Sequence, residues 1–165
     1  TAGEFGHTII QTKSEFKCTC GNYGCFMACA SGIAIPQHFR NKIAQGKKSI
    51  MLESEETEID KIDGKFIKTG FDQGDLVCME IVRDFADFAG IGLYNLFQTF
   101  NPPLILLGGG LTNWGEYYLN GIKSKFYSMA GDMIYDPIEI NLAGLKEDAG
   151  LIGAAALCKE ILSNY

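Results

Sequence analysis

The chain has 165 residues, 47% of them hydrophobic and 21% charged, a composition that indicates a globular domain with a core and excludes a disordered segment. Its formal net charge of −6 argues against a surface for nucleic acid, because a phosphate backbone is bound by a positive patch. No run of about 18 apolar residues occurs, so we expect neither a membrane span nor a signal peptide.

The first predicted element is a strand over Phe5–Thr12, a short stretch rich in β-branched residues. Residues 13–25 form a polar loop that would be unstable without a metal. Over residues 24–45 the apolar spacing is helical, and Pro36 predicts two helices or a kink near Ile35.

One histidine and three cysteines gather around this loop, and they form the most specific motif of the chain. They are His7, Cys18, Cys20 and Cys25. Zinc prefers thiolate and imidazole ligands, and four of them close a tetrahedral shell. Gly21 and Gly24 let the backbone fold back toward one ion. We therefore predict a structural zinc site with no open coordination position, in preference to a chance grouping or to redox chemistry at Cys18 and Cys20.

The other cysteines, Cys29, Cys78 and Cys158, lie in apolar helical surroundings, so we expect buried and reduced thiols. A cytoplasmic location fits this usage better than a secreted disulfide framework does.

Residues 47–75 are polar and predict a solvated connection with short helical turns. Asp75 is then expected to cap a long buried helix, which the prolines at 102–103 stop. Gly90 and Gly92 lie inside this helix, where glycine lowers stability, so close packing or a nearby ligand is the expected reason.

Leu104–Leu107 is an apolar run typical of a strand that is buried on both faces of a parallel sheet. A helix is predicted over about 115–129, a second strand over 138–142, and a closely packed helix of small residues over 148–163. This order of strands and helices predicts an α/β fold.

Gly108, Gly109 and Gly110 follow the first of these strands and suit a phosphate cradle. Glycines let backbone amides approach an anion, and the next helix presents its positive end. The same glycines also suit an ordinary tight turn, and they form neither a Walker A loop nor a GxGxxG motif. Glu4 stands in a turn flanked by glycines, where its carboxylate either accepts hydrogen bonds from substrate hydroxyls or is a plain surface charge. His38 is expected to be a packing or surface residue.

Taken together, these segments resemble the ROK family (repressor, open reading frame, kinase) of sugar kinases and transcriptional repressors. The specific part is Gly3–His7 joined to Cys18–Cys25. Residues 101–111 and 148–155 support it and follow in the expected order, so the similarity covers nearly the whole chain.

The resemblance implies an actin-like, ribonuclease-H-like ATPase fold of two lobes, with residues 1–165 as most of the C-terminal lobe and an inserted zinc-binding loop. The chain opens at Thr1 directly on a motif, so we expect it to be part of a longer protein whose N-terminal lobe is absent here. The resemblance also implies structural zinc at the four ligands, ATP with magnesium beside Gly108–Gly110, a sugar that faces Glu4 and His7, and a cytoplasmic homodimer.

The expected function of the full-length protein is an ATP-dependent kinase that phosphorylates a hexose or amino-hexose. Family kinases carry a glutamate two positions after the last zinc cysteine, where it touches a sugar hydroxyl. Met27 stands there in this chain, and a thioether cannot replace a carboxylate acceptor. The catalytic aspartate of these kinases belongs to the other lobe. No residue here is therefore assigned as catalytic base, and the chain alone is expected to be inactive.

Two alternatives stand beside the kinase. One is the non-catalytic sugar-sensing domain of a ROK-type repressor, which Met27 favours. Nucleic acid would then be a partner only through a helix-turn-helix located upstream. The other is a zinc-stabilised α/β module that binds a protein partner.

Overall fold

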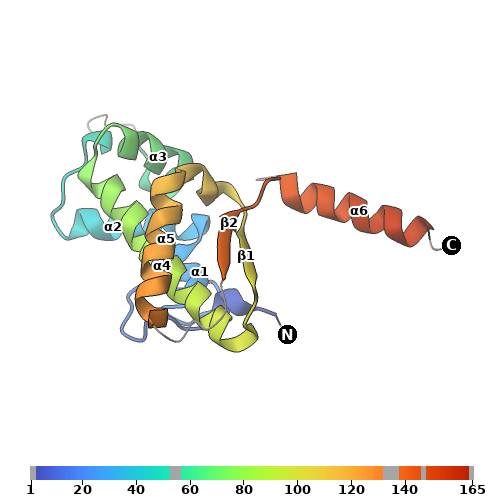
Figure 1. Ribbon diagram of the computed structural model, residues 1–165. Coiled ribbons are helices and arrows are strands. Elements are labelled where there is room, and N and C mark those ends of the chain that lie inside the picture. The colour runs from blue at the N-terminus through green and yellow to red at the C-terminus, as the bar shows by residue number, and fades with distance from the viewer. Residues whose placement is uncertain (1–2, 53–56, 132–137, 146–147, 164–165) are drawn as a thin grey trace.

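Helices build most of the body of the protein, and one long helix extends from it as an arm (Figure 1). The computed structural model describes residues 3–52, 57–131, 138–145 and 148–163. The α-helices are α1 (Phe26–Ala30), α2 (Ile35–Ala44), α3 (Gly64–Asp72), α4 (Leu76–Phe100), α5 (Glu116–Ala130) and α6 (Ala149–Ser163). The strands are β1 (Leu104–Leu107) and β2 (Glu139–Leu142). The short 3-10 helices are η1 (Phe5–His7), η2 (Gly32–Ala34), η3 (Ile50–Leu52), η4 (Ile59–Lys61) and η5 (Gly110–Trp114).

α4 is the central element, and α1, α2, α3 and α5 all pack against it. Its apolar residues recur at helical spacing, and Phe85 at its middle is fully buried. Asp75 caps the first turn by accepting a hydrogen bond of 2.8 Å from the amide of Cys78. Asn101 ends the helix in the left-handed conformation, with φ 45°. The long capped helix predicted from the sequence is thus confirmed.

Close packing accounts for the two glycines inside α4. A Cβ atom at Gly90 would lie 2.6 Å from Cβ of Lys125 on α5, and one at Gly92 would lie 2.6 Å from the ring of Phe26 on α1. Both separations are far shorter than ordinary contact between carbon atoms. Only glycine therefore lets α1 and α5 approach α4 this closely.

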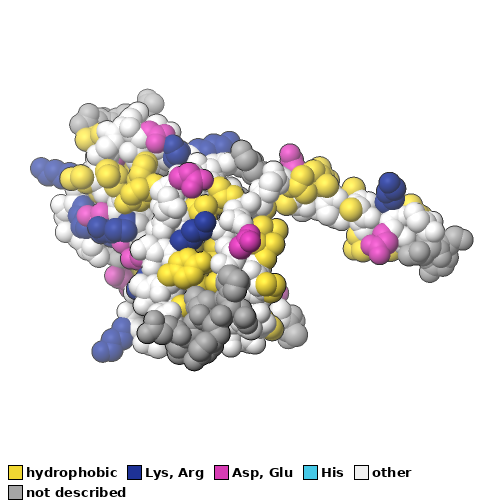
Figure 2. Space-filling view, in the orientation of Figure 1, with side chains coloured by type: hydrophobic (Ala, Val, Ile, Leu, Met, Phe, Trp, Pro, Cys, Tyr) yellow, Lys and Arg dark blue, Asp and Glu magenta, His cyan; other side chains and the backbone are white. Residues whose placement is uncertain are grey.

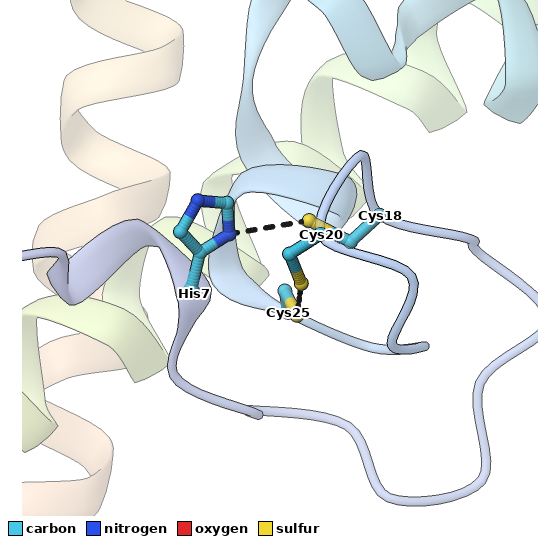
Figure 3. A group of neighbouring side chains, drawn as sticks. All are labelled: His7, Cys18, Cys20 and Cys25. Carbon is cyan, nitrogen blue, oxygen red and sulfur yellow. Dashed lines mark hydrogen bonds between the residues drawn. The ribbon is translucent and has the colours of Figure 1, made fainter.

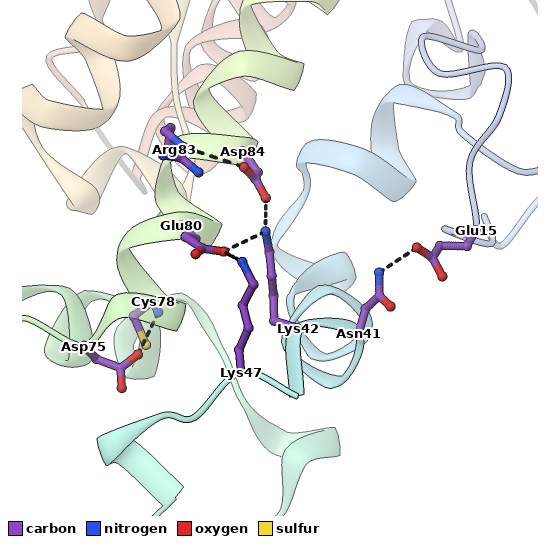
Figure 4. A network of polar contacts seen from close by, with 9 residues as sticks. All are labelled: Glu15, Asn41, Lys42, Lys47, Asp75, Cys78, Glu80, Arg83 and Asp84. Atoms are coloured by element: carbon purple, nitrogen blue, oxygen red, sulfur yellow. Dashed lines mark hydrogen bonds and ion pairs between the residues drawn. The ribbon is translucent and has the colours of Figure 1, made fainter. Parts of the chain in front are cut away.

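The predicted break between two helices over residues 24–45 is confirmed. Ser31 has an extended backbone after α1, η2 follows, and Pro36 lies in the first turn of α2. Proline is tolerated there because the first amides of a helix have no partner within it. Lys42 then ties α2 to α4 by ion pairs with Glu80 at 3.1 Å and Asp84 at 2.5 Å (Figure 4).

α3 corrects the expectation that residues 47–75 contain only short turns. Asp63 caps this helix by accepting hydrogen bonds from two backbone amides of its first turn. Ile67 is fully buried in the core. A short polar segment thus becomes a helix because the core covers its one apolar face. Residues 53–56 of this segment lie outside the described part of the chain.

The strand predicted over Phe5–Thr12 is wrong. The chain forms the 3-10 helix η1 there, and Ile9 makes only an isolated antiparallel bridge with Cys25. β-branched residues favour a strand where a partner strand extends beside them. No such partner strand occurs within the residues that the structure describes.

β1 and β2 form a two-stranded parallel sheet in which Ile105 lies opposite Ile140, and both of these side chains are buried. Leu104 and Leu106 point to the other face and are 45% and 58% exposed. β1 is therefore buried on one face only, which corrects the expectation of burial on both. Parallel sheets are normally covered on both faces, and no described element covers this one.

α6 leaves the body as an arm with apolar side chains along its length (Figures 1 and 2). Leu151 and Leu162 are 75% and 76% exposed, and Cys158 is exposed as well. The predicted close packing of this helix and the predicted burial of Cys158 are both wrong here, because no described element covers α6. No helix in the described part of the chain is long and apolar enough to cross a membrane.

Candidate functional site

The predicted zinc ligands come together at the loop near the start of the chain (Figure 3). One ligand atom from each of the four side chains lies within 4.8 Å of all the others. His7 Nδ1 is 3.4 Å from Cys18 Sγ, and Cys20 Sγ is 3.6 Å from Cys25 Sγ. In a tetrahedral site with Zn–S bonds of about 2.3 Å, neighbouring sulfur atoms lie about 3.8 Å apart. The donor set and its spacing therefore fit a tetrahedral zinc ion.

Glycines fold the loop back on itself. Gly24 has φ +72°, and a Cβ atom there would collide with the carbonyl oxygen of Gln11. Gly21 has φ +93° in the turn that separates Cys20 from Cys25. Glycine takes these conformations without the strain that another residue would carry. The backbone turn predicted at these two glycines is confirmed.

The thiols of the cluster differ in their affinity for protons. Hydrogen bonding from the backbone of Asn22 lowers the pKa of Cys20 to about 7, whereas burial raises the pKa of Cys25 to about 12. A buried thiol loses its proton when a cation binds, because the metal ligand is the thiolate. Metal binding at this cluster would therefore release protons and weaken as the pH falls.

Residues of α2 pack against the loop that carries the cysteines and stabilise it. The ring of His38 stacks on Phe16 with 3.6 Å between centroids, and its Nε2 donates to the carbonyl oxygen of Ala28 at 3.1 Å. Asn41 donates to the carboxylate of Glu15 at 2.9 Å (Figure 4). Burial lowers the pKa of His38 to about 4, so the ring is neutral at neutral pH. His38 is thus a packing residue, as one of the two expectations had it.

Glu4 and His7 lie side by side at the open edge of the cluster. Oε2 of Glu4 is 3.8 Å from Nε2 of His7, while Nδ1 of the same ring faces Cys18. A single imidazole can therefore face an ion with one nitrogen and a second group with the other. The side chain of Glu4 is 62% exposed, so this corner is accessible from solvent.

Met27 lies on α1, where it lines a hollow of about 220 Å³ that we call the Met27 hollow. The other lining residues are Gly6, Phe26, Ala30 and Ser31. The Ser31 hydroxyl donates to the backbone carbonyl of Met27 at 2.6 Å. The described lining of this hollow is therefore largely apolar and contains no carboxylate.

The glycine turn joins β1 to η5. Gly109 has φ +92°, and no heavy atom lies within 4 Å of the position that its Cβ would take, so the turn is open. α5 does not follow directly, because η5 intervenes and α5 begins only at Glu116. The helix predicted over about 115–129 is confirmed as α5, and η5 separates its first turn from Gly108–Gly110. The glycine turn itself is an open backbone that can approach an anion.

Three adjoining hollows connect the glycine turn with the cysteine–histidine loop and with α3. The Met27 hollow meets one of about 320 Å³ at the glycine turn, which in turn meets one of about 480 Å³ between η5 and α3. We call the last of them the α3 hollow. The shared lining residues are Phe26, Ala30 and Ser31 at the first junction, and Gly32, Gly110 and Leu111 at the second.

The α3 hollow is the part of the site that sequence reasoning missed. Lys65 and Lys68 of α3 line it, together with Gly110 on the side of η5. Asp63 also lines it, but its carboxylate accepts hydrogen bonds from two backbone amides. Lys68 forms an ion pair with Asp72 of the same helix, so Lys65 supplies the positive charge of this lining on a chain whose net charge is −6. A positive side chain there suits an anionic ligand. The cap at Asp63 was the signal in the sequence that could have revealed this helix.

Comparison with known sequences finds glucokinases and xylose repressors among the relatives of this chain. The sequence profile of the ROK family matches residues 1–161. The glucokinase of Streptomyces coelicolor is 32% identical over 162 residues, which cover 96% of this chain and 51% of that enzyme. The xylose repressor of Caldicellulosiruptor bescii is 28% identical over 156 residues, which cover 94% of this chain and 38% of the repressor.

Comparison with solved structures agrees. A ROK family glucokinase from Streptomyces griseus, in complex with glucose and AMPPNP, matches with a TM-score of 0.79 and 32% identity. The match covers 95% of this chain and 51% of that glucokinase, so the chain spans about half the length of these relatives. The likeness shows the actin-like ATPase fold expected from the sequence, with helices and a parallel sheet mixed.

Proposed function

The chain belongs to the ROK family, and on this premise we propose that it is the C-terminal lobe of an ATP-dependent kinase for a hexose or amino-hexose. One observation carries the proposal. Gly6, which lies between Glu4 and His7, lines the Met27 hollow, and this hollow adjoins the one at the glycine turn. Phosphoryl transfer depends on holding acceptor and donor in line, so a kinase needs two substrate sites that adjoin.

The sugar end is the corner formed by Glu4 and His7. The carboxylate accepts hydrogen bonds from sugar hydroxyls, and Nε2 of the histidine faces the same side. Zinc bound by His7 and the three cysteines would be structural, because four protein ligands leave no open position. The ion would fix the histidine ring through Nδ1 and leave Nε2 for the substrate. Met27 supplies no carboxylate, so Glu4 and His7 carry the polar contacts.

The nucleotide end begins at Gly108–Gly110, which lie beside the phosphates of ATP and its magnesium ion. The α3 hollow continues from there and takes the nucleoside. Its volume of about 480 Å³ lies within the range of about 300–1,000 Å³ that is usual for small-molecule sites. Lys65 adds positive charge near an anionic ligand, whereas Lys68 is paired with Asp72. The AMPPNP bound by the Streptomyces griseus glucokinase supports a nucleoside triphosphate as donor.

The remaining groups of the kinase would come from an N-terminal lobe. We assign the catalytic base to that lobe and none to this chain. The exposed apolar helix α6 and the open face of β1 support such a lobe, because neighbouring domains cover surfaces of this kind. The proposal also includes a homodimer and a cytoplasmic location. The free cysteines of the described chain support the location.

The second candidate is the sugar-sensing domain of a ROK repressor. The 28% identity with a xylose repressor supports it. Met27 favours it as well, because the position lacks the carboxylate that the resemblance to family kinases implies. This candidate keeps the sugar site and dispenses with ATP turnover.

Two substitutions in the full-length protein test the two ends separately. Glu4→Gln removes a charged acceptor and should raise the KM for sugar about tenfold while the KM for ATP stays unchanged. Gly109→Ala places a side chain at φ +92° and should raise the KM for ATP alone. A raised KM for ATP in Glu4→Gln, or a raised KM for sugar in Gly109→Ala, would contradict the assignment of the sugar and nucleotide sites. Sugar-dependent DNA binding without ATP turnover would favour the repressor.

A further inference from the structure

Trp114 joins the two walls of the α3 hollow. It is the single tryptophan of the chain, it ends η5, and only 3% of it is exposed. Its indole Nε1 donates a hydrogen bond of 2.8 Å to the carbonyl oxygen of Gly64, the first residue of α3. This bond therefore links the start of α3 to η5, the elements that line the hollow on either side.

The backbone of α3 lies close to η5 at the same point. A Cβ atom at Gly64 would be 3.4 Å from Leu111 Cδ2 and 3.7 Å from Trp114 Nε1. Gly64 and Leu111 both line the α3 hollow, whereas Trp114 is not among its lining residues. The separation of the two walls is thus set by the contact of the Gly64 backbone with the Leu111 side chain and by the hydrogen bond from Trp114.

The core fixes the indole on its other sides. The ring centroid lies 5.1 Å from that of Tyr118 on α5 and 5.5 Å from that of Phe85 on α4. An indole N–H is a donor only, so the carbonyl of Gly64 is its natural partner in a buried site. Trp114 therefore holds the first turn of α3, which carries Lys65, in a fixed position relative to α4 and α5.

We propose that Trp114 is a positioning residue for the nucleotide: by holding the start of α3 against η5, it sets the width of the α3 hollow. The inference rests on the proposed function, because it takes this hollow to be the nucleoside site. Trp114 acts through Gly64 and Lys65, so its removal widens the site without deleting a group that touches the nucleotide. The effect is on nucleotide affinity and leaves sugar affinity and the chemical step alone.

The test compares Trp114→Phe with Tyr127→Phe in the full-length protein. The first variant keeps an aromatic ring in the core but loses the donor to Gly64. The second also deletes a donor to a backbone carbonyl, that of Ile138 at 3.0 Å, from a side chain that is 43% exposed and lies outside the three hollows. For Trp114→Phe we expect the Kd for ADP, measured by calorimetry, and the KM for ATP to rise about tenfold. The KM for sugar and kcat should change less than about twofold. Tyr127→Phe should leave all four values unchanged.

Lys65→Ala separates a failure of this inference from a failure of the proposed function. If Lys65→Ala weakens ADP binding and Trp114→Phe does not, the nucleotide site stands and the role of Trp114 is overturned. If neither variant changes ADP binding, or the wild type binds no ADP, the α3 hollow is not the nucleotide site and both proposals fall. Equal losses in Trp114→Phe and Tyr127→Phe would indicate general destabilisation and would also overturn the positioning role.

Discussion

Cys20→Ser removes one proposed zinc ligand with the least change in packing. Cys20 is exposed, whereas Cys18 and Cys25 are buried. Serine at position 20 therefore leaves no cavity in the core, and substitution of either other cysteine would mix the loss of metal with the loss of buried volume. Any disorder of the loop in this variant then follows from the metal.

The magnitude follows from the loss of one of the four proposed ligands. The small apolar cluster there consists of Cys18, Cys25 and Ala28, with Phe16 and Met27 packed against it. Losing only a group that supports a ligand costs about 10- to 100-fold in metal affinity. Loss of a ligand should therefore cost at least about 100-fold, or about 2.7 kcal/mol of binding free energy. The wild type should carry about one zinc per chain, and Cys20→Ser less.

Metal analysis, competition with a chromophoric chelator, and limited proteolysis measure these effects. Cys158→Ser is the control, because it removes an exposed thiol from α6, away from the cluster. We expect Cys20→Ser to lose zinc and to be cleaved faster between His7 and Cys25, and Cys158→Ser to match the wild type. Wild-type zinc affinity in Cys20→Ser would refute the reasoning, as would a zinc-free wild type whose cleavage does not change with a chelator.

Three further predictions concern stability, each measured by urea denaturation. Burial holds the pKa of His38 at about 4, below its value of 6.5 in the unfolded chain, so the unfolded chain binds more protons between these values. The free energy of unfolding should fall by up to about 3 kcal/mol as the pH drops through this window. His38→Phe should remove most of this dependence on pH. Asp75→Ala leaves three donors without their acceptor and should lower the free energy of unfolding by about 3–5 kcal/mol. A decrease of less than about 1 kcal/mol would contradict the role of Asp75 as a buried helix cap. Gly92→Ala crowds the ring of Phe26 and should cost about 1–3 kcal/mol.

Local signals in the sequence predicted those parts of the fold that depend on neighbouring residues. The cap at Asp75 and the prolines after Asn101 bound α4, and the spacing of the apolar residues between them places its buried face. The cysteines cluster because their loop is short and Gly21 and Gly24 turn it back. These features are determined within a few positions of the chain, so the sequence alone reveals them.

The predictions that failed depend on which other elements pack against a segment. β1 and α6 have the composition of buried elements, but burial depends on what lies against them, and no described element does so. The strand predicted near Ile9 failed for the same reason, since a strand needs a partner. The bond between Trp114 and Gly64 joins residues 50 positions apart, so no local pattern could indicate it.

Sugar-dependent release of ADP by the full-length protein tests the central claim most directly. ATP, magnesium and a panel of hexoses and amino-hexoses are supplied, and ADP and phosphorylated sugar are both quantified. The account predicts equal amounts of the two products with at least one of these sugars, and neither product when sugar or magnesium is left out. A protein that binds one of these sugars but releases no sugar-dependent ADP with any of them would contradict the kinase assignment.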